Sequence, residues 1–144
     1  MPVPRSTLLP ASRQRQRGAF AVEFAITLGL FLLLVFAIAN LGLAAWNYNT
    51  MSHASREGVR YGSVLSNSEG RYSREQASAL IRARVQDHAV GQRFDAIDIS
   101  WEGGDNAPGK VVTVTTRYRF YPVTPLFGTL GISLRSSASM MLSN

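Results

Sequence analysis

The chain has 144 residues, 46% of them hydrophobic and 17% charged, which suffices for an anchor and one small domain but excludes a large multidomain enzyme. Its formal net charge of +6 comes from 15 Lys and Arg against 9 Asp and Glu. Four arginines precede residue 18, where no acidic residue occurs: Arg5, Arg13, Arg15 and Arg17. This basic excess lies in a short tail ahead of an apolar run, and not across a folded face among aromatic residues. It therefore argues against a nucleic-acid-binding protein.

The residue types needed for most catalytic and metal sites are scarce. The chain has no cysteine and two histidines, His53 and His88. The lack of cysteine excludes a disulfide scaffold, a thiolate metal site, a cysteine nucleophile and a lipoprotein anchor. No motif of a zinc-binding histidine pair, a nucleophilic serine elbow or a phosphate-binding glycine loop occurs. We therefore expect a non-catalytic protein with no cofactor and no metal.

The first half of the sequence predicts a membrane anchor. Residues 1–18 contain three prolines and the arginine run and have nothing to bury, so we expect them to be disordered. Residues 24–46 carry no formal charge. A helix of that length, at ~1.5 Å per residue, reaches about 34 Å and spans a bilayer. The positive-inside rule places the arginine side in the cytoplasm and exports the C-terminal part.

These zones give three expected domains. We expect a basic cytoplasmic leader over residues 1–18, a transmembrane and assembly helix over residues 19–46, and an exported domain over residues 47–144. Trp46 and Tyr48 then fall where an interfacial aromatic belt is expected.

The exported part begins with helical patterns. Small and apolar residues recur three or four positions apart at Met51, Ala54, Gly58, Tyr61 and Leu65. This spacing predicts that the membrane helix continues outward. After a loop over residues 66–70, Ser73 and Gln76 form an S-x-x-Q capping box, which predicts a second, short helix. Its expected apolar stripe is Ala77, Leu80, Ile81 and Val85.

After Gly91 the period changes to two, which predicts strands. Apolar and polar residues alternate over residues 97–101 and again over 112–120, with a turn-rich stretch at 102–109, so we expect a hairpin. A third strand is expected over residues 132–142, with one face formed by Ile132, Leu134, Ala138, Met140 and Leu142. Pro122, Pro125 and Gly128 separate it from the hairpin. A three-stranded antiparallel sheet needs cover on its apolar face, so the sequence predicts an α+β domain in which the two helices supply that cover.

Glu23 is the only charged residue between Gly18 and Arg56. One interpretation is an interfacial carboxylate that reaches the headgroups and stabilises the helix N-terminus. The other starts from Ala19, which lies one turn before Glu23 on the same helix face. A cut after Gly18 frees an amine at Ala19. In a bundle of parallel helices this amine and the Glu23 carboxylate of a staggered neighbour neutralise each other, so the pair fixes the register.

Two further features of the helix concern processing and packing. Gly18 offers an endoprotease a small residue directly after the basic segment. Ala21, Ala25 and Gly29 form a row of small residues, the pattern that lets membrane helices approach closely. Ordinary alanine and glycine usage in a membrane helix is an equally good interpretation of that row.

Two motifs carry a family resemblance. The string R-G-A-F-A-V-E-F over residues 17–24, followed by an apolar helix, resembles the prepilin cleavage motif of the tight-adherence (Tad) subclass of type IV pilins. The string A-S-R-E-G-V-R-Y-G just beyond the membrane helix resembles the signature of TadE-like proteins. It comprises Ala54, Ser55, Arg56, Glu57, Gly58, Val59, Arg60, Tyr61 and Gly62. Residues 112–122 and the serine-rich last strand are also similar.

The resemblance implies a minor pilin or pseudopilin of a Tad pilus apparatus that supports adhesion or biofilm formation. It implies Gly18 and Ala19 as the pair cut by a prepilin peptidase, and Glu23 as the carboxylate of assembly or processing. The implied location is the bacterial inner membrane, with the C-terminal domain in the periplasm. Implied partners are the peptidase, other pilin or pseudopilin subunits, Tad apparatus proteins and the lipid bilayer. Val59 and Gly62 stand where alanine is common in the family.

Two alternatives stay open. Ala37-Ile38-Ala39 matches an ordinary signal-peptidase site, and a cut after Ala39 would release a secreted soluble protein that begins at Asn40. The apolar residues 41–46 and the early Glu23 are not required by such a signal. The other alternative is an uncleaved anchor that carries a periplasmic enzyme or sensor domain.

The remaining polar residues suggest no site. Glu57 can pair with His53 and Arg60 on one solvated helix face. Asp95, Asp98, Asp105 and Asn106 lack the spacing of a calcium loop.

Overall fold

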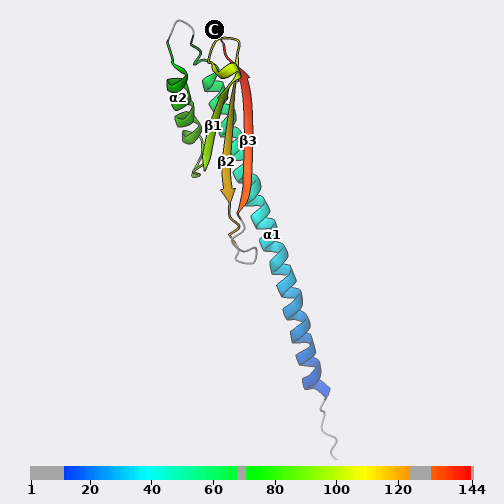
Figure 1. Cartoon of the computed structure of the whole chain (residues 1–144). Coiled ribbons are helices and arrows are strands. Elements are labelled where there is room, and N and C mark those ends of the chain that lie inside the picture. The colour runs from blue at the N-terminus through cyan, green and yellow to red at the C-terminus, as the bar shows by residue number, and fades with distance from the viewer. Residues whose placement is uncertain (1–11, 68–70, 124–130, 144) are drawn as a thin grey trace, which may run out of the picture. The chain divides into compact units, whose positions relative to one another are not determined.

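The computed structural model describes residues 12–67, 71–123 and 131–143, with side chains from Gly18 onward. The elements follow the order α1 (Ser12–Gly62), α2 (Arg74–Asp87), β1 (Ala96–Trp101), the short 3₁₀ turn η2 (Glu102–Gly104), β2 (Val111–Phe120) and β3 (Ile132–Met141) (Figure 1). The chain divides into two compact units, Met1–Ala39 and Asn40–Asn144, and α1 contributes to both.

Within the first unit the structure describes only α1. The helix begins at Ser12, so the expectation of a disordered tail is wrong for residues 12–18, whereas residues 1–11 lie outside the described part. No proline follows Pro10 until residue 108, so nothing in the covalent chain interrupts the helix after Ser12. The continuation of α1 to Gly62 confirms the predicted outward extension.

The second unit starts at Asn40, inside the run whose hydropathy predicts a membrane span. Asn40 is buried, and its Oδ1 accepts a hydrogen bond of 2.9 Å from the backbone N–H of Val123. Two turns further along α1, Asn47 is also buried, and its Oδ1 accepts a hydrogen bond from Nε2 of Gln92. Two asparagines therefore attach the middle of α1 to segments that are distant in sequence.

The predicted capping box begins α2. The Ser73 hydroxyl accepts from the Gln76 backbone N–H at 3.2 Å, and the Gln76 side chain accepts from the Ser73 N–H at 3.0 Å. The buried side chains of α2 are those of Ala77, Ile81 and Val85. The expectation that Leu80 belongs to this stripe is wrong, because the contact follows positions four residues apart and leaves Leu80 38% exposed at its flank.

The three strands form the predicted antiparallel sheet in the order β1-β2-β3. Ile99 lies opposite Val114, and Val114 lies opposite Ala138, so apolar side chains of all three strands share one face. Gly103 and Gly104 give the turn after β1 its positive φ values of 69° and 75°, which other residues rarely adopt. Part of the stretch between β2 and β3, including Pro125 and Gly128, lies outside the described residues.

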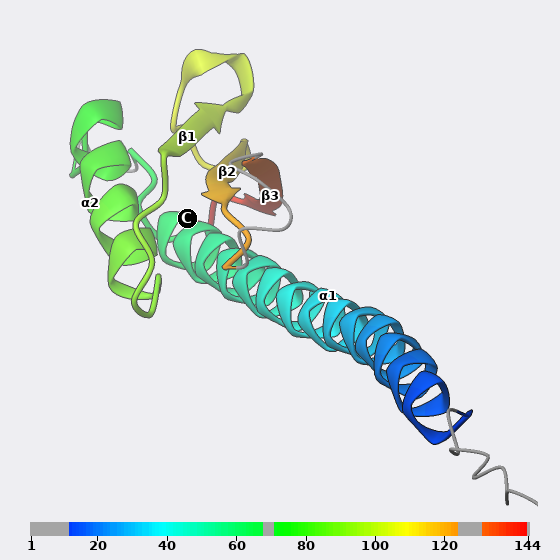
Figure 2. The ribbon, with the colours of Figure 1, turned by 90° about the horizontal axis from the view of Figure 1, so that it is seen from below.

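The core of the second unit lies where the last turns of α1 and all of α2 meet the apolar face of the sheet (Figures 1 and 2). Its buried members are Ala54, Val59, Leu65, Ala77, Ile81, Val85, Val112, Val114 and Leu142. At the edge strand β3 the cover is incomplete, since Ile132 and Met140 are exposed although both lie on the apolar face. The helices therefore cover the centre of the sheet and not the whole predicted face of the third strand.

Candidate functional site

The predicted processing residues lie in the first unit, on α1. Gly18, Ala19 and Glu23 are all exposed, and a side chain built at Gly18 would meet no atom within 4 Å. Ala19 and Glu23 are four residues apart in the helix, which places them one turn apart on one face, as predicted. Among the side chains that the structure describes, none is paired with the Glu23 carboxylate.

The small-residue row of the same unit is also uncovered. Ala21, Ala25 and Gly29 are exposed, and a side chain at Gly29 would have open space around it. The large apolar side chains around them are exposed as well, Phe24 and Phe31 both at 58%. α1 is long and apolar enough to cross a membrane. Since so much apolar surface is unfavourable in water, this unit requires lipid or other helices around it.

The signature over residues 54–62 lies in the second unit and divides into a buried and an exposed face. The buried face points at α2 and the sheet and consists of Ala54, Ser55, Gly58, Val59 and Gly62. A methyl group at Gly58 would overlap Cγ2 of Val85, and one at Gly62 would come within 2.8 Å of Cδ1 of Ile81. The absence of a side chain at both glycines is therefore what allows α2 to approach α1 closely.

A buried hydrogen bond connects this face to the sheet. The hydroxyls of Ser55 and Thr116 lie 2.9 Å apart, and both residues are fully buried. The Ser55 hydroxyl also lies 2.9 Å from the Met51 carbonyl oxygen, to which it can donate, so Thr116 then donates to Ser55. The polar group of Ser55 is thus satisfied in the core.

Ser55→Ala is expected to lower the free energy of unfolding of the second unit by about 1–3 kcal/mol, because it leaves the Thr116 hydroxyl buried without its partner. Thr116→Val should cost a similar amount, and the double variant should cost clearly less than the sum. Denaturant unfolding in detergent measures all three. Strictly additive losses would contradict the assignment of this pair as a coupled contact.

The exposed face of the signature is charged and solvated. Arg56 and Arg60 are exposed, and Arg60 lies 3.9 Å from the Glu57 carboxylate, which confirms the pair expected three residues apart. The Arg84 guanidinium of α2 lies 5.8 Å from the centre of the Tyr61 ring. Such exposed pairs contribute little stability.

The side chains of the two histidines lie next to each other, although His53 is on α1 and His88 is at the end of α2. The rings of His53 on α1 and His88, the C-terminal cap of α2, stack with centroids 6.0 Å apart. Among the described residues, no group of three or more His, Asp or Glu side chains could hold a metal ion. Two of the residues that lack calcium-loop spacing have structural contacts: Asp98 pairs with Arg117 at 2.7 Å, and buried Asn106 donates to the carbonyls of Leu65 and Tyr72.

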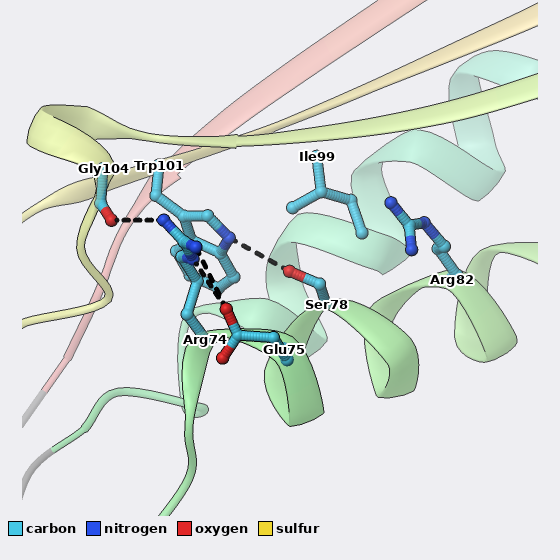
Figure 3. Close-up of a pocket in the computed structure, with 7 residues that line it drawn as sticks. All are labelled: Arg74, Glu75, Ser78, Arg82, Ile99, Trp101 and Gly104. Atoms are coloured by element: carbon cyan, nitrogen blue, oxygen red, sulfur yellow. Dashed lines mark hydrogen bonds and ion pairs between the residues drawn. The ribbon is translucent and has the colours of Figure 1, made fainter.

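An open groove of about 380 Å³ lies between α2 and β1 (Figure 3). Its lining residues are Arg74, Glu75, Ser78, Arg82, Ile99, Trp101 and Gly104. The indole N–H of Trp101 donates to the Ser78 hydroxyl at 3.1 Å, and Arg74 donates to the Gly104 carbonyl at 3.0 Å. Arg82 donates to the backbone carbonyl of Ile97 at 3.4 Å. These groups are engaged in holding α2 on the sheet.

The electrostatics of the groove fit a structural role. Glu75 is its only carboxylate among the lining residues. Hydrogen bonds from its own backbone amide and from the Arg74 guanidinium lower its pKa. A lowered pKa keeps the carboxylate charged, which suits an ion pair and not a general base near neutral pH.

Residues 18–60 match the family of TadE-like proteins. The matched stretch contains the predicted processing residues, the apolar helix and the signature up to Arg60. It confirms the predicted resemblance over this stretch, whereas residues 61–144 lie beyond it. Neither the curated proteins nor the solved structures contain a significant match to the chain.

Proposed function

From the TadE-like match over residues 18–60, we propose that the chain is a non-catalytic minor pilin or pseudopilin of a Tad pilus apparatus, and that it supports adhesion or biofilm formation. The observation that carries the proposal is the coincidence of that match with an exposed apolar helix. This helix bears one carboxylate close to its start, at Glu23. The non-catalytic part of the proposal is supported by the match, because pilin-related proteins of this kind are generally non-catalytic.

The proposed location is the bacterial inner membrane. α1 anchors the chain, the arginine-rich N-terminus stays in the cytoplasm by the positive-inside rule, and the second unit is periplasmic. A prepilin peptidase then cuts between Gly18 and Ala19. The exposure of both residues supports access by the enzyme, although the cut requires local opening of α1 at this point.

After the cut, α1 packs against the corresponding helices of other pilin or pseudopilin subunits and Tad apparatus proteins. The uncovered row of Ala21, Ala25 and Gly29 supports close helix approach. The new amine at Ala19 pairs with the Glu23 carboxylate of a staggered neighbour. Burial of both charges is favourable only in the register that brings them together, since an unpaired charge in an apolar bundle is costly.

A second candidate function is supported by one specific observation. The second unit begins at Asn40, which is also the residue that a signal peptidase would leave after cutting at Ala39. A secreted soluble domain of residues 40–144 would retain every core residue of that unit. Its exposed Trp46 and the apolar residues around it favour the anchored protein.

Determination of the mature N-terminus in the native host tests both candidates. We expect Ala19 in the wild type and retention of the leader in Gly18→Leu, because a bulky residue before the scissile bond blocks the peptidase. Gly42→Leu is the matched control: a side chain there also meets no atom within 4 Å, so processing should stay normal. A mature chain that begins at Asn40 would replace the proposal by the secreted protein, and an intact N-terminus would favour an uncleaved anchor.

A further inference from the structure

We propose that the end of the sheet beside Asn40 lies on the membrane and binds anionic phospholipid headgroups. We call this surface the basal rim and define it by Arg119, Tyr121, Val123 and Ile132. The inference rests on the proposed anchoring of α1 in a bilayer and adds a second, peripheral contact with the same membrane.

Contacts within the second unit show which part of α1 the basal rim lies beside. β2 runs antiparallel to the last turns of α1: a methyl group at Gly62 would lie 3.6 Å from Cγ1 of Val112, and Ser55 bonds Thr116. Further along, the Val123 N–H donates to Asn40. Residues 117–123 therefore lie alongside the part of α1 between Ser55 and Asn40.

Asn40 directly follows residues 18–39, a mostly apolar stretch in which Glu23 is the only charged residue. At ~1.5 Å per residue those residues reach about 33 Å, which matches a hydrocarbon core of about 30 Å. When they span the bilayer, Asn40 lies at its surface, and its hydrogen bond holds Val123 at the same level. Trp46 follows about 9 Å further along α1, and its exposed ring suits the headgroup region.

The side chains of the rim are those of a membrane-binding surface. Tyr121, Val123 and Ile132 are 55%, 74% and 53% exposed, although all three are large and apolar or aromatic. A methyl group at Gly131 would lie 2.7 Å from the Arg119 stem and 3.0 Å from the Tyr121 ring, so both side chains extend across this glycine. The rim thus combines apolar groups that can enter the interface with a cation beside them.

The charge of the adjoining sheet face fits an anionic partner. Arg117 and Arg135 lie directly opposite each other on neighbouring strands, an arrangement that is unfavourable without counter-charge. Among the described strand residues of this face, Asp98 is the only acid, and it pairs with Arg117 at 2.7 Å. A net positive charge therefore remains, and guanidinium groups bind phosphate oxygens well.

Single-cysteine labelling tests the position of the rim, because the chain has no cysteine of its own. The full chain with a bimane label at Leu32→Cys, Val123→Cys or Asp105→Cys is reconstituted in nanodiscs of phosphatidylcholine and phosphatidylglycerol. Quenching by brominated lipids and by aqueous iodide is compared. We expect lipid quenching at positions 32 and 123 and aqueous quenching at 105, which lies in the turn at the other end of the sheet.

The labels separate the two hypotheses. If position 32 is quenched by iodide, the proposed anchoring itself fails. If position 32 lies in lipid while position 123 behaves like 105, the anchoring stands and the basal rim is overturned.

Charge-removing variants test the lipid preference. Spin-labelled phosphatidylglycerol and phosphatidylcholine report the relative association of the two lipids with the reconstituted chain. A basic residue near an anionic surface contributes about 1 kcal/mol, so Arg119→Gln is expected to lower the phosphatidylglycerol preference by up to about fivefold. Arg135→Gln lies further from the rim and should have a smaller effect, since the surface potential decays within about 10 Å at 0.1 M salt.

Lys110→Gln is the control of equal charge change at the opposite end of the sheet, where Lys110 is exposed and its carbonyl accepts a hydrogen bond from the Leu142 N–H just after β3. It should leave the preference unchanged. The leader arginines are present in every variant, so their effect cancels in the comparison. If Arg119→Gln and Lys110→Gln have equal effects, the rim does not bind anionic headgroups.

Discussion

Gly58→Leu is expected to destabilise the second unit by about 3 kcal/mol or more and to detach α2 from α1. The first added carbon already overlaps Cγ2 of Val85, and the Ile81 and Val114 side chains lie next to it at 3.7 and 3.6 Å. The site is enclosed by α2 and the sheet, so the leucine cannot turn away without moving an element. Overpacking of a core typically costs 1–3 kcal/mol, and the overlap here involves a side chain that is fully buried.

The matched control is Gly42→Leu, on the same helix but with open space around it. There the substitution should be neutral or stabilising, because leucine has a higher helix propensity than glycine by nearly 1 kcal/mol. Denaturant unfolding in detergent gives the two free energies, and hydrogen exchange shows whether the amides of α2 lose protection. Equal stability of the two variants would contradict the close contact between α1 and α2.

Local patterns in the sequence predict most of the secondary structure. The capping box at Ser73 is present with both of its hydrogen bonds, because it involves only residues three apart. The alternation in residues 97–101 and 112–120 predicts the hairpin, since side chains on alternate positions share one face. The confirmed α+β fold thus follows from signals within single elements and from the need to cover one face of the sheet.

Local sequence patterns do not predict which distant elements contact each other. The signature glycines at 58 and 62 were visible as family residues, but their partners Val85 and Ile81 belong to another helix. Likewise, hydropathy assigns residues 40–46 to the membrane run, whereas Asn40 is buried against Val123 in the second unit. The available signal was the polar Asn40 within an otherwise apolar run, together with Asn47 two turns later. Their partners could not be deduced without the fold.

The proposed assembly residues differ from the core residues, because their proposed partners belong to other subunits. The described part of the structure places Gly18, Ala19 and Glu23 on an exposed stretch of α1 and brings no described side chain to them. The sequence motif and the helical spacing therefore carry the hypothesis, and contacts between subunits are needed to test it.

Glu23→Ala is expected to leave membrane insertion intact and to abolish assembly. Insertion does not need the carboxylate, since an acidic residue in a membrane helix is itself unfavourable, by up to about 3 kcal/mol at the centre and less near an end. On the proposed pairing, assembly needs the carboxylate, because the variant leaves the Ala19 amine of each neighbour unpaired in an apolar bundle. Removing one partner of a buried ion pair typically costs 3–5 kcal/mol, which corresponds to a loss of more than a hundredfold in each helix contact.

Three measurements on the Glu23→Ala strain separate assembly from processing. Membrane fractionation reports insertion, N-terminal sequencing reports the cut at Ala19, and sheared-pilus yield with subunit cross-linking reports assembly. We expect normal insertion, a normal cut and no incorporation. Loss of the cut instead would assign the carboxylate to recognition by the peptidase.

The matched control is Glu57→Ala on the same helix. Its carboxylate pairs with Arg60 at the surface, at 3.9 Å, and such a pair contributes at most a few tenths of a kcal/mol. This variant should therefore assemble normally, so a defect confined to position 23 reflects burial of its charge between subunits and not the loss of a carboxylate as such. Wild-type amounts of pili and of apparatus proteins in Glu23→Ala would show that the carboxylate does not set the register.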